Sequence, residues 1–289
     1  MRVKKQIRLA IQSNAGGSGK TTMAVHLAYA IGVKGYKVTV IELDQSGSLK
    51  RFVGLEPAPP HKSMAKVLEK EFDGNYPFVS IWTDHLKTVN VLQGGASLEG
   101  SIQAIISTLA SKYHVLAHCL EDYPIASDLI ILDTPASLEP MGKVALAAAT
   151  HVLIPIKPEF KDTDGAAELI RWYNNTVKEL RLKPKPEIIG FVPTRVDLDF
   201  GPHKNILGVE REKGTGKVIR KKNVPEEETL PYYIQVLGYD CFPIVRESSE
   251  YINASGYGLP LQIHRPGNNA AKDLNPIVNR LLKTLRESI

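Results

Sequence analysis

Residues 14–22 read NAGGSGKTT, and this stretch decides the fold class of the chain. Its second half fits the phosphate-binding loop pattern G-x-x-x-x-G-K-[ST] at Gly19, Lys20 and Thr21. The first glycine of that pattern should stand at position 14, where this chain has Asn14. The stretch is therefore a variant loop, and its meaning depends on the residues around it.

Short apolar strands and amphipathic helices alternate on both sides of the loop. The expected strands are 3–13, 36–44, 128–133, 151–156 and 187–193, and the expected helices are 20–33 and 163–180. This alternation predicts an α/β fold, a mostly parallel twisted sheet with helices on both faces. The sequence has no repeat and no low-complexity linker, so residues 1–289 are expected to form a single domain.

The composition is that of an ordinary soluble globular protein, with 43% hydrophobic and 23% charged residues. Two cysteines, Cys119 and Cys241, are too few for a disulfide framework and too far apart for a Cys-x-x-Cys site. We therefore expect a reducing, cytosolic setting. The net charge of +5 favours an anionic partner such as nucleic acid, but a basic protein without such a partner is equally consistent with this number.

The glycine loop lies between a strand and a helix, where ligands of parallel sheets bind. Backbone amides of such a turn point inward and form a concavity for phosphate oxygens. The expected phosphate-binding residues are Gly16, Gly17, Ser18, Gly19, Lys20, Thr21 and Thr22. Lys20 would reach the β- and γ-phosphates, and the Thr21 hydroxyl would ligate Mg²⁺. Asp133 ends an apolar strand and is expected to hold the same metal ion. The sequence thus predicts a P-loop NTPase.

Three ordered motifs resemble the ParA/MinD family of deviant P-loop ATPases. They are GGSGKTT (16–22), ELDQSGS (42–48) and LIILDTPAS (129–137). The loop of that family runs K-G-G-x-G-K-[ST]-T, so Gly16 and Gly17 match its glycine pair. The likeness continues through IPIKPE (154–159), GFVPTRVD (190–197) and INASGYGLP (252–260) and leaves out a stretch near 200–230.

The resemblance implies that Asp44 takes part in hydrolysis. In the family, the acid at the end of the second strand, in D-x-D-P-Q-G, positions and polarises the attacking water. Asp44 matches this acid, while the earlier acid is Glu42. A carboxylate at this strand end can also contact metal-bound waters. The alternative is an aspartate that only caps a turn or a helix.

Ala15 is the main departure from the family. Most members carry a signature lysine here, which crosses an ATP-sandwich dimer to the phosphates of the partner. Either hydrolysis is very slow or another cation replaces this lysine, with Lys157 the first candidate and Lys161 the second. Solvated loop lysines are the alternative for both. Loss of this lysine in a chain otherwise close to ParA resembles the McdA subgroup, which distributes carboxysomes on the nucleoid.

The bound base is expected to be adenine. Residues 194–197, TRVD, resemble in part the [NT]-K-x-D guanine reader, with arginine in place of lysine. Related ATPases have a similar N-R-x-D stretch that contacts adenine. The resemblance therefore implies ATP rather than GTP, with Thr194, Arg195 and Arg246 lining the base.

Two segments outside the motifs have to be interpreted separately. An insertion at about 198–231 contains KGTGKVIRKK at 213–222, with five Lys or Arg and no acid. A flexible basic loop could contact DNA phosphates, or it could be a solvated loop neutralised by the glutamates at 226–228. A helix expected at about 270–287 has one apolar face. It could target a membrane as in MinD, but packing against the core is favoured.

The resemblance implies a ParA-like ATPase in the cytoplasm, associated with the nucleoid and without stable membrane association. Its homodimer would enclose ATP and Mg²⁺ and bind nonspecific DNA. A small ParB-like or McdB-like activator would stimulate hydrolysis, and the cargo would be a carboxysome, plasmid or chromosome. Two alternatives are a MinD-like membrane-associated positioning ATPase and a small-molecule ATP-dependent ligase of the same fold, such as a relative of dethiobiotin synthetase.

Overall fold

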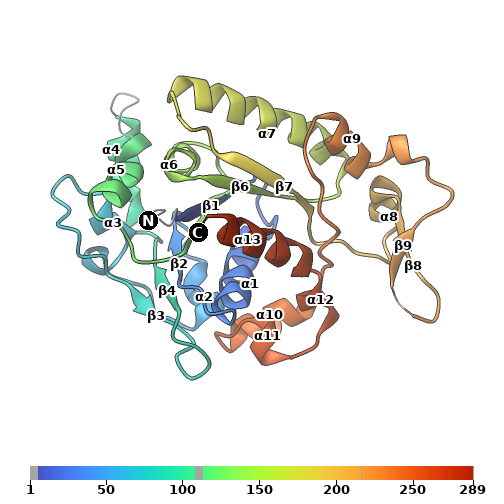
Figure 1. Ribbon diagram of the computed structural model, residues 1–289, viewed down its shortest axis with the longest axis horizontal. Coiled ribbons are helices and arrows are strands. Elements are labelled where there is room, and N and C mark those ends of the chain that lie inside the picture. Colours follow the sequence, from blue (N-terminus) through green and yellow to red (C-terminus); the bar gives the residue numbers. More distant parts are fainter. Residues whose placement is uncertain (1–5, 108–112, 216, 289) are drawn as a thin grey trace.

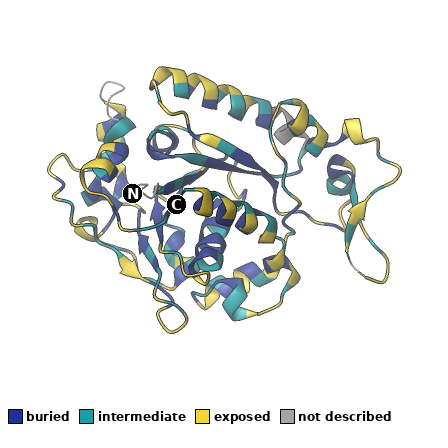
Figure 2. Cartoon of the chain, viewed as in Figure 1, coloured by how far each residue is buried: buried dark blue, intermediate teal, exposed yellow. Residues whose placement is uncertain are grey.

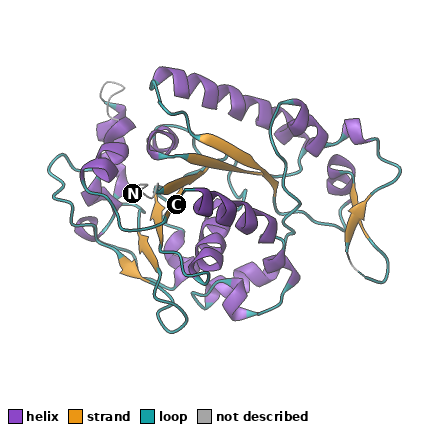
Figure 3. Cartoon of the chain, viewed as in Figure 1, coloured by secondary structure: helices purple, strands orange, loops and turns teal. Residues whose placement is uncertain are grey.

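A seven-stranded sheet forms the middle layer of the computed structural model, which describes residues 6–107, 113–215 and 217–288 (Figure 1; Figure 3). The strands are β1 Ile7–Ile11, β2 Val38–Glu42, β3 Val79–Ser80, β4 Val89–Leu92, β5 Leu129–Asp133, β6 His151–Ile156 and β7 Glu187–Pro193. Their order is β3-β4-β2-β5-β1-β6-β7, and only the edge strand β3 pairs antiparallel. The predicted mostly parallel α/β sheet is confirmed.

Helices cover the sheet on both faces. They are α1 Lys20–Gly32, α2 Leu49–Val53, α3 Met64–Val67, α4 Leu98–Ile106, α5 Val115–Asp122, α6 Met141–Ala148, α7 Phe160–Glu179, α8 Gly201–Leu207, α9 Leu230–Val236, α10 Ser249–Gly256, α11 Leu261–His264, α12 Asn269–Lys272 and α13 Asn275–Glu287. Short 3₁₀ helices in the described part of the chain include η1 Pro60–Lys62 and η3 Glu226–Glu228.

Successive residues of the central strands pack on opposite sides, which explains the helices on both faces. Ile131 in β5 belongs to the core cluster formed with α1 and α13, whereas Ile130 and Leu132 belong to the cluster formed with α3 to α6. Figure 2 shows the strands buried and the outer faces of the covering helices exposed. The continuous apolar runs in the sequence reflect this two-sided burial.

The apolar face of the C-terminal segment packs into the protein core, as predicted. Ile277, Val278, Leu281, Leu282 and Leu285 of α13 are all buried in one cluster with α1. This packing uses the face that a membrane-targeting helix would present to lipid. Among the described helices, none combines the length and the apolar character that a bilayer crossing requires.

The segment expected as one helix at about 270–287 folds as two helices, of which α13 covers most of that range. Helix α12 ends at Lys272, and α13 begins at Asn275 with Pro276 in its first turn. Proline lacks a backbone N–H and cannot continue the hydrogen-bond ladder of a preceding helix, but it is tolerated in a first turn. The break therefore falls at residues 273–274, just before the first turn that contains Pro276.

The insertion at about 198–231 folds into short helices and a hairpin instead of a flexible loop. Helix α8 has a proline in its first turn. It is capped at its carboxyl end by Gly208, which has a left-handed φ of 63°. An antiparallel hairpin follows, with β8 at Val209–Arg211 and β9 at Val218–Arg220. Proline at the start, glycine at the end and β-branched strand residues explain these elements.

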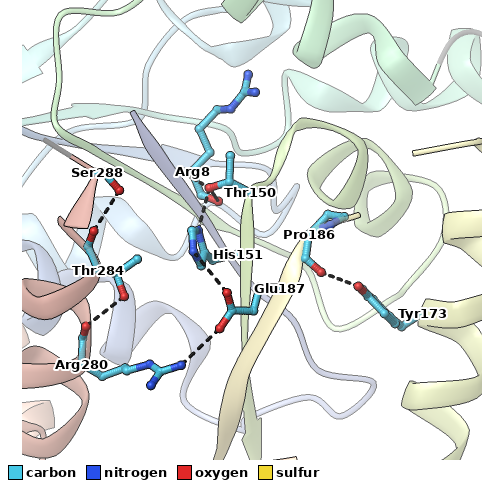
Figure 4. Close-up of polar contacts among 9 residues, drawn as sticks. All are labelled: Arg8, Thr150, His151, Tyr173, Pro186, Glu187, Arg280, Thr284 and Ser288. Carbon is cyan, nitrogen blue, oxygen red and sulfur yellow. Dashed lines mark hydrogen bonds and ion pairs between the residues drawn. The ribbon is translucent and has the colours of Figure 1, made fainter. Parts of the chain in front are cut away.

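A polar cluster at the amino-terminal ends of β6 and β7 connects the sheet to α13 (Figure 4). Arg280 on α13 donates from Nη2 to Glu187 Oε1 at 3.2 Å, and His151 Nε2 lies 4.0 Å from Glu187 Oε2. His151 Nδ1 lies 2.8 Å from Thr150 Oγ1. Exposed ion pairs of this kind add little stability, so burial of the apolar face remains the main attachment of α13.

Candidate functional site

A cavity of about 460 Å³ lies at the carboxyl-terminal end of the sheet. That size is typical of small-molecule sites. Its lining includes Gly16, Gly17, Ser18, Gly19, Lys20, Thr21, Thr22, Met23, Asp44, Ser46, Ser48, Phe52, Thr194, Arg195, Arg246, Glu247, Tyr251, Ile252 and Leu274. The structure thus brings every predicted loop residue together with Asp44 and the three predicted base residues.

The glycine loop owes its shape to two residues with left-handed backbone conformations. Gly17 has φ 66° and Gly19 has φ 84°, values that L side chains rarely adopt. Gly19 caps the amino end of α1, so the first amides of the helix are available to an anion. Between them, Ser18 is fully buried, and its carbonyl accepts the Thr194 hydroxyl at 2.8 Å.

Lys20 is folded back over the loop that it follows. Its Nζ donates to the Ala15 carbonyl at 3.1 Å and lies 3.4 Å from Ser18 Oγ. Burial lowers the pKa of Lys20, while Asp133 and Asp44 raise it. The ammonium group is thus held by a backbone oxygen of residue 15, and the alanine side chain at that position has no part in this contact.

Asp133 is the clearest indication of a bound cation in the described part of the chain. The residue has 0% exposure, and neither carboxylate oxygen has a hydrogen-bond partner among the described residues. Burial first, and then nearby Glu42, raises the pKa of Asp133 to about 8. The Thr21 side chain lowers this pKa in part, but its hydroxyl bonds to Ser48 Oγ at 3.1 Å. A buried carboxylate without partners is costly, and a cation removes that cost.

These residues fit Mg²⁺, which nucleotides bring with them. Magnesium is usually held by one or two protein oxygens together with water and phosphate oxygens. Thr21 and Asp133, the two residues that the sequence suggests as magnesium ligands, offer such oxygens near the loop. Asp44 also lines the cavity, with Oδ1 accepting the Ser46 N–H at 2.8 Å, a turn contact that holds its carboxylate in the wall.

Glu42 supports the turn that carries Asp44, a role that sequence reasoning missed. Its carboxylate is 1% exposed and accepts the Leu49 N–H at 2.8 Å and the Gly94 N–H at 2.9 Å. These bonds connect the start of α2 to the end of β4. Burial raises the pKa of Glu42 to about 7, although both backbone bonds lower it. The position of Glu42 in the ELDQSGS motif, two residues before Asp44, was the sequence feature that could have indicated this supporting role.

Lys157 and Arg195 both lie over the loop at Gly17. A Cβ atom built on Gly17 would lie 3.6 Å from Lys157 Nζ and 3.2 Å from Arg195 Nη1. The charge of Lys157 also contributes to the lowered pKa of Lys20. Arg195 donates to the Gly17 carbonyl at 3.3 Å and to Glu247 at 2.7 Å. The side chain of Lys161, the second candidate, lies outside the described residues.

Two of the residues predicted to line the base, Thr194 and Arg246, also bond to other parts of the protein. Thr194 is 2% exposed, and its hydroxyl donates to the loop carbonyl of Ser18, so this hydroxyl shapes the loop. Arg246 donates to both carboxylate oxygens of Asp273, at 2.6 and 2.9 Å. Its guanidinium group is therefore fixed by an ion pair at the cavity wall.

An apolar part of the wall was not predicted from the sequence. It is formed by Phe52, Val245, Tyr251, Ile252 and Leu274. Apolar and aromatic surfaces beside a few polar groups are typical of sites for flat ligands such as purines. Ile252 falls in the INASGYGLP motif, but apolar residues in a helical stretch gave no sign that they face a ligand.

The family model described as "AAA domain" matches residues 6–188. The chromosome-partitioning ATPase Soj of Thermus thermophilus is 30% identical over 193 residues, which are 66% of this chain and 70% of Soj. The chain belongs to the ParA-type P-loop ATPases. It spans 54% of the length of a replication protein A relative from Rhizobium rhizogenes, at 24% identity.

Solved structures support the ParA-type fold over almost the whole chain. Apo McdA of Cyanothece superposes with a TM-score of 0.75 at 20% identity, covering 96% of this chain and 100% of McdA. MinD of Pyrococcus horikoshii in complex with Mg-ADP has a TM-score of 0.69 at 18% identity and covers 99% of both chains. The predicted ParA/MinD family and McdA-like fold are confirmed, and nucleotide and magnesium use is established for the family.

The two buried carboxyls predict an unusual pH dependence for the nucleotide-free ParA-type chain. The pKa of Glu42 rises from 4.5 to about 7 and that of Asp133 from 3.8 to about 8. Between these values the folded chain binds more protons than the unfolded chain, so a rise in pH favours unfolding. Buried His26, whose pKa falls from 6.5 to about 4, acts in the opposite direction below pH 6.5, so the melting temperature should fall most clearly between about pH 6.5 and pH 8. Thermal unfolding at a series of pH values measures this.

An Asp133→Asn variant should have a flatter melting temperature profile, because its side chain no longer releases a proton. The exposed Asp84→Asn substitution is the matched control and should leave the profile unchanged. A profile of equal slope in wild type and Asp133→Asn would show that Asp133 does not hold a proton in the folded chain.

Proposed function

We propose that this ParA-type protein is an ATPase that binds ATP with Mg²⁺ between two copies of the chain, binds DNA in that state and positions a cargo. The observation that carries the proposal is the fully buried Asp133, whose carboxylate oxygens have no hydrogen-bond partner among the described residues and whose pKa responds to Lys20 and Thr21, in a chain of the partitioning ATPase family. In the nucleotide-free chain a proton can neutralise this carboxyl group, and a cation that arrives with the ligand would stabilise its ionised form.

The residues of the cavity have distinct roles in binding. The amides from Gly16 to Thr22 and the Lys20 ammonium bind the phosphates. Thr21 and Asp133 hold Mg²⁺, which neutralises charge on the phosphate oxygens when it is bound. The apolar wall that includes Phe52 and Tyr251 receives the adenine, beside the fixed guanidinium of Arg246.

Hydrolysis requires a water molecule in line with the terminal phosphate and a cation to stabilise the transition state. Asp44 orients the water, because its carboxylate stands in the cavity wall at the end of β2. Lys157 supplies positive charge in place of the missing signature lysine. The 3.6 Å distance from its Nζ to a Cβ position on Gly17 supports this role.

An exposed apolar side chain at the cavity supports association between two copies. Ile252 lines the cavity and is 73% exposed, so part of the apolar cavity wall faces solvent in the single chain. A second chain placed over the nucleotide would cover it. We expect a small ParB-like or McdB-like partner to stimulate hydrolysis, and a carboxysome, plasmid or chromosome to be the cargo.

Light scattering on the purified full chain tests the proposed function. Wild type and Asp44→Ala should double in mass with Mg-ATP, and Asp44→Ala should remain associated for longer. The associated species should bind duplex DNA. Lys20→Ala, which lacks the phosphate-binding ammonium, should stay monomeric and is the negative control. A loaded wild-type chain that remains monomeric contradicts the proposal.

Two alternatives make different predictions in the same measurements. A MinD-like ATPase would bind liposomes in the ATP state, but burial of the apolar face of α13 argues against this. A small-molecule ligase of the same fold would be a dimer without nucleotide and would not bind DNA.

A further inference from the structure

The folded insertion forms an arm at one end of the molecule. Figure 1 shows α8, the β8–β9 hairpin and α9 beyond β7, where the hairpin projects away from the sheet. We call residues 209–222 the basic arm. Figure 2 shows most of its surface exposed, whereas Val209 and Val218 pack partly against the third core cluster.

The basic arm is held in place at its base by several bonds. The Lys221 N–H donates to the Gly208 carbonyl at 2.8 Å, and Lys221 Nζ donates to Asn205 Oδ1 at 2.5 Å. Near the tip, the Glu212 N–H donates to the Lys217 carbonyl at 2.8 Å. The arm is therefore a two-stranded ribbon with a defined orientation.

Three lysines of the basic arm carry charge that the protein does not neutralise. Lys213, Lys217 and Lys222 are exposed and have no ion pair within the described part of the chain. Of the other three cations of the arm, Lys221 donates to Asn205, and two form ion pairs, Arg211 with Asp199 at 3.5 Å and Arg220 with Glu226 at 3.1 Å. Both pairs are exposed, so they are weak, and phosphate oxygens can replace the carboxylates.

The composition of the basic arm favours duplex DNA as its partner. Residues 209–222 contain no aromatic side chain, and Ile219 is the one large hydrophobic side chain exposed there, at 38%. Protein interfaces depend on buried aromatic anchors, and single-stranded nucleic acids are bound by stacking on aromatic rings. Lysines without aromatic residues suit the phosphate backbone of a duplex, whose binding is electrostatic and tolerant of sequence.

We infer that the basic arm is a nonspecific duplex-DNA binding site, with Lys213, Lys217 and Lys222 contacting phosphates. This inference rests on the proposed function, because it assigns the DNA binding of the ATP-loaded dimer to a particular surface. A two-stranded ribbon is also narrow enough to follow the major groove of DNA. The arm adds this surface without using any residue of the nucleotide cavity.

Binding of the full-length chain to a short duplex, measured by fluorescence anisotropy with Mg-ATP at several salt concentrations, tests the assignment. The triple substitution of Lys213, Lys217 and Lys222 by alanine should weaken binding about tenfold or more. It should also reduce the slope of log K against log salt concentration by about 2.7 for each protomer that contacts the duplex, because each of the three phosphate contacts contributes about 0.9 to that slope. Changing the same lysines to arginine should retain both the affinity and the slope.

Three other exposed lysines, Lys34, Lys62 and Lys70, serve as the matched control, because their loss removes the same charge. Their triple substitution by alanine should leave the salt slope unchanged. Equal losses in the two triple variants would mean that net charge alone matters, and the assignment would be wrong. The assignment would also be overturned if the full-length chain bound polyglutamate or single-stranded DNA as tightly as it binds the duplex, with the same dependence on the three lysines.

Failure of this assignment is distinguishable from failure of the proposed function. If the arm variant associates with Mg-ATP and binds duplex with the wild-type salt slope, the DNA site lies elsewhere and the proposed function stands. If the wild-type chain associates but does not bind duplex at any salt concentration, the DNA-binding part of the proposed function fails as well.

Discussion

An Asp44→Ala variant should bind ATP with near-normal affinity and hydrolyse it about 10²–10⁴ times more slowly than the wild type. The phosphates depend on the loop amides and Lys20, which this substitution leaves intact. The attacking water loses the carboxylate that stands in the cavity wall beside Ser46. Isothermal titration calorimetry measures the affinity, and single-turnover phosphate release measures the rate.

The matched control for this prediction is Asp84→Ala, which removes an exposed carboxylate away from the cavity. It should hydrolyse ATP at the wild-type rate. Normal turnover in Asp44→Ala would remove Asp44 from the mechanism and support its alternative role, a turn residue that only accepts the Ser46 N–H.

A Lys157→Ala variant should lose about 10³-fold or more in turnover, because a cation at the transition state contributes at least this much in related phosphoryl transfers. The expected loss arises because Ala15 provides no charge at the signature position. Lys157→Arg should retain part of the rate. Affinity for ATP should change much less than turnover, which separates a catalytic role from simple binding.

Lys185→Ala is a suitable control, because this lysine is exposed and lies outside the cavity lining. Lys161→Ala tests the second candidate in the same assay. If Lys157→Ala turns over at the wild-type rate and Lys161→Ala does not, the charge comes from Lys161. Wild-type rates in both variants would mean that neither lysine replaces the signature lysine.

The strand and helix pattern was predictable wherever the chain is buried on both sides. The expected strands 151–156 and 187–193 coincide with β6 and β7, and the helix after the loop begins at Lys20 as expected. The stretch between β2 and β5 gave no comparable signal. Its strands are short, as in β3 at Val79–Ser80, and such segments lack a readable period.

The site was predictable where a motif fixes the geometry. The glycine loop and Asp44 line one cavity, and Asp133 ends the neighbouring strand behind them, because parallel strands end at the same edge of the sheet. The Thr194 bond to the loop and the Arg246 ion pair were not predictable, because each depends on a distant partner. Glu42 was missed because its two backbone partners come from separate segments.

The basic arm lies apart from the nucleotide cavity, and this separation bears on how the protein would be released from DNA. If the basic arm binds DNA as inferred, a single copy would bind the duplex through one arm and only weakly, and pairing of two copies would make the second contact intramolecular. Such avidity can exceed either single affinity by a factor of about 10²–10⁴. Separation of the pair after hydrolysis would then suffice for detachment, without any rearrangement of the hairpin.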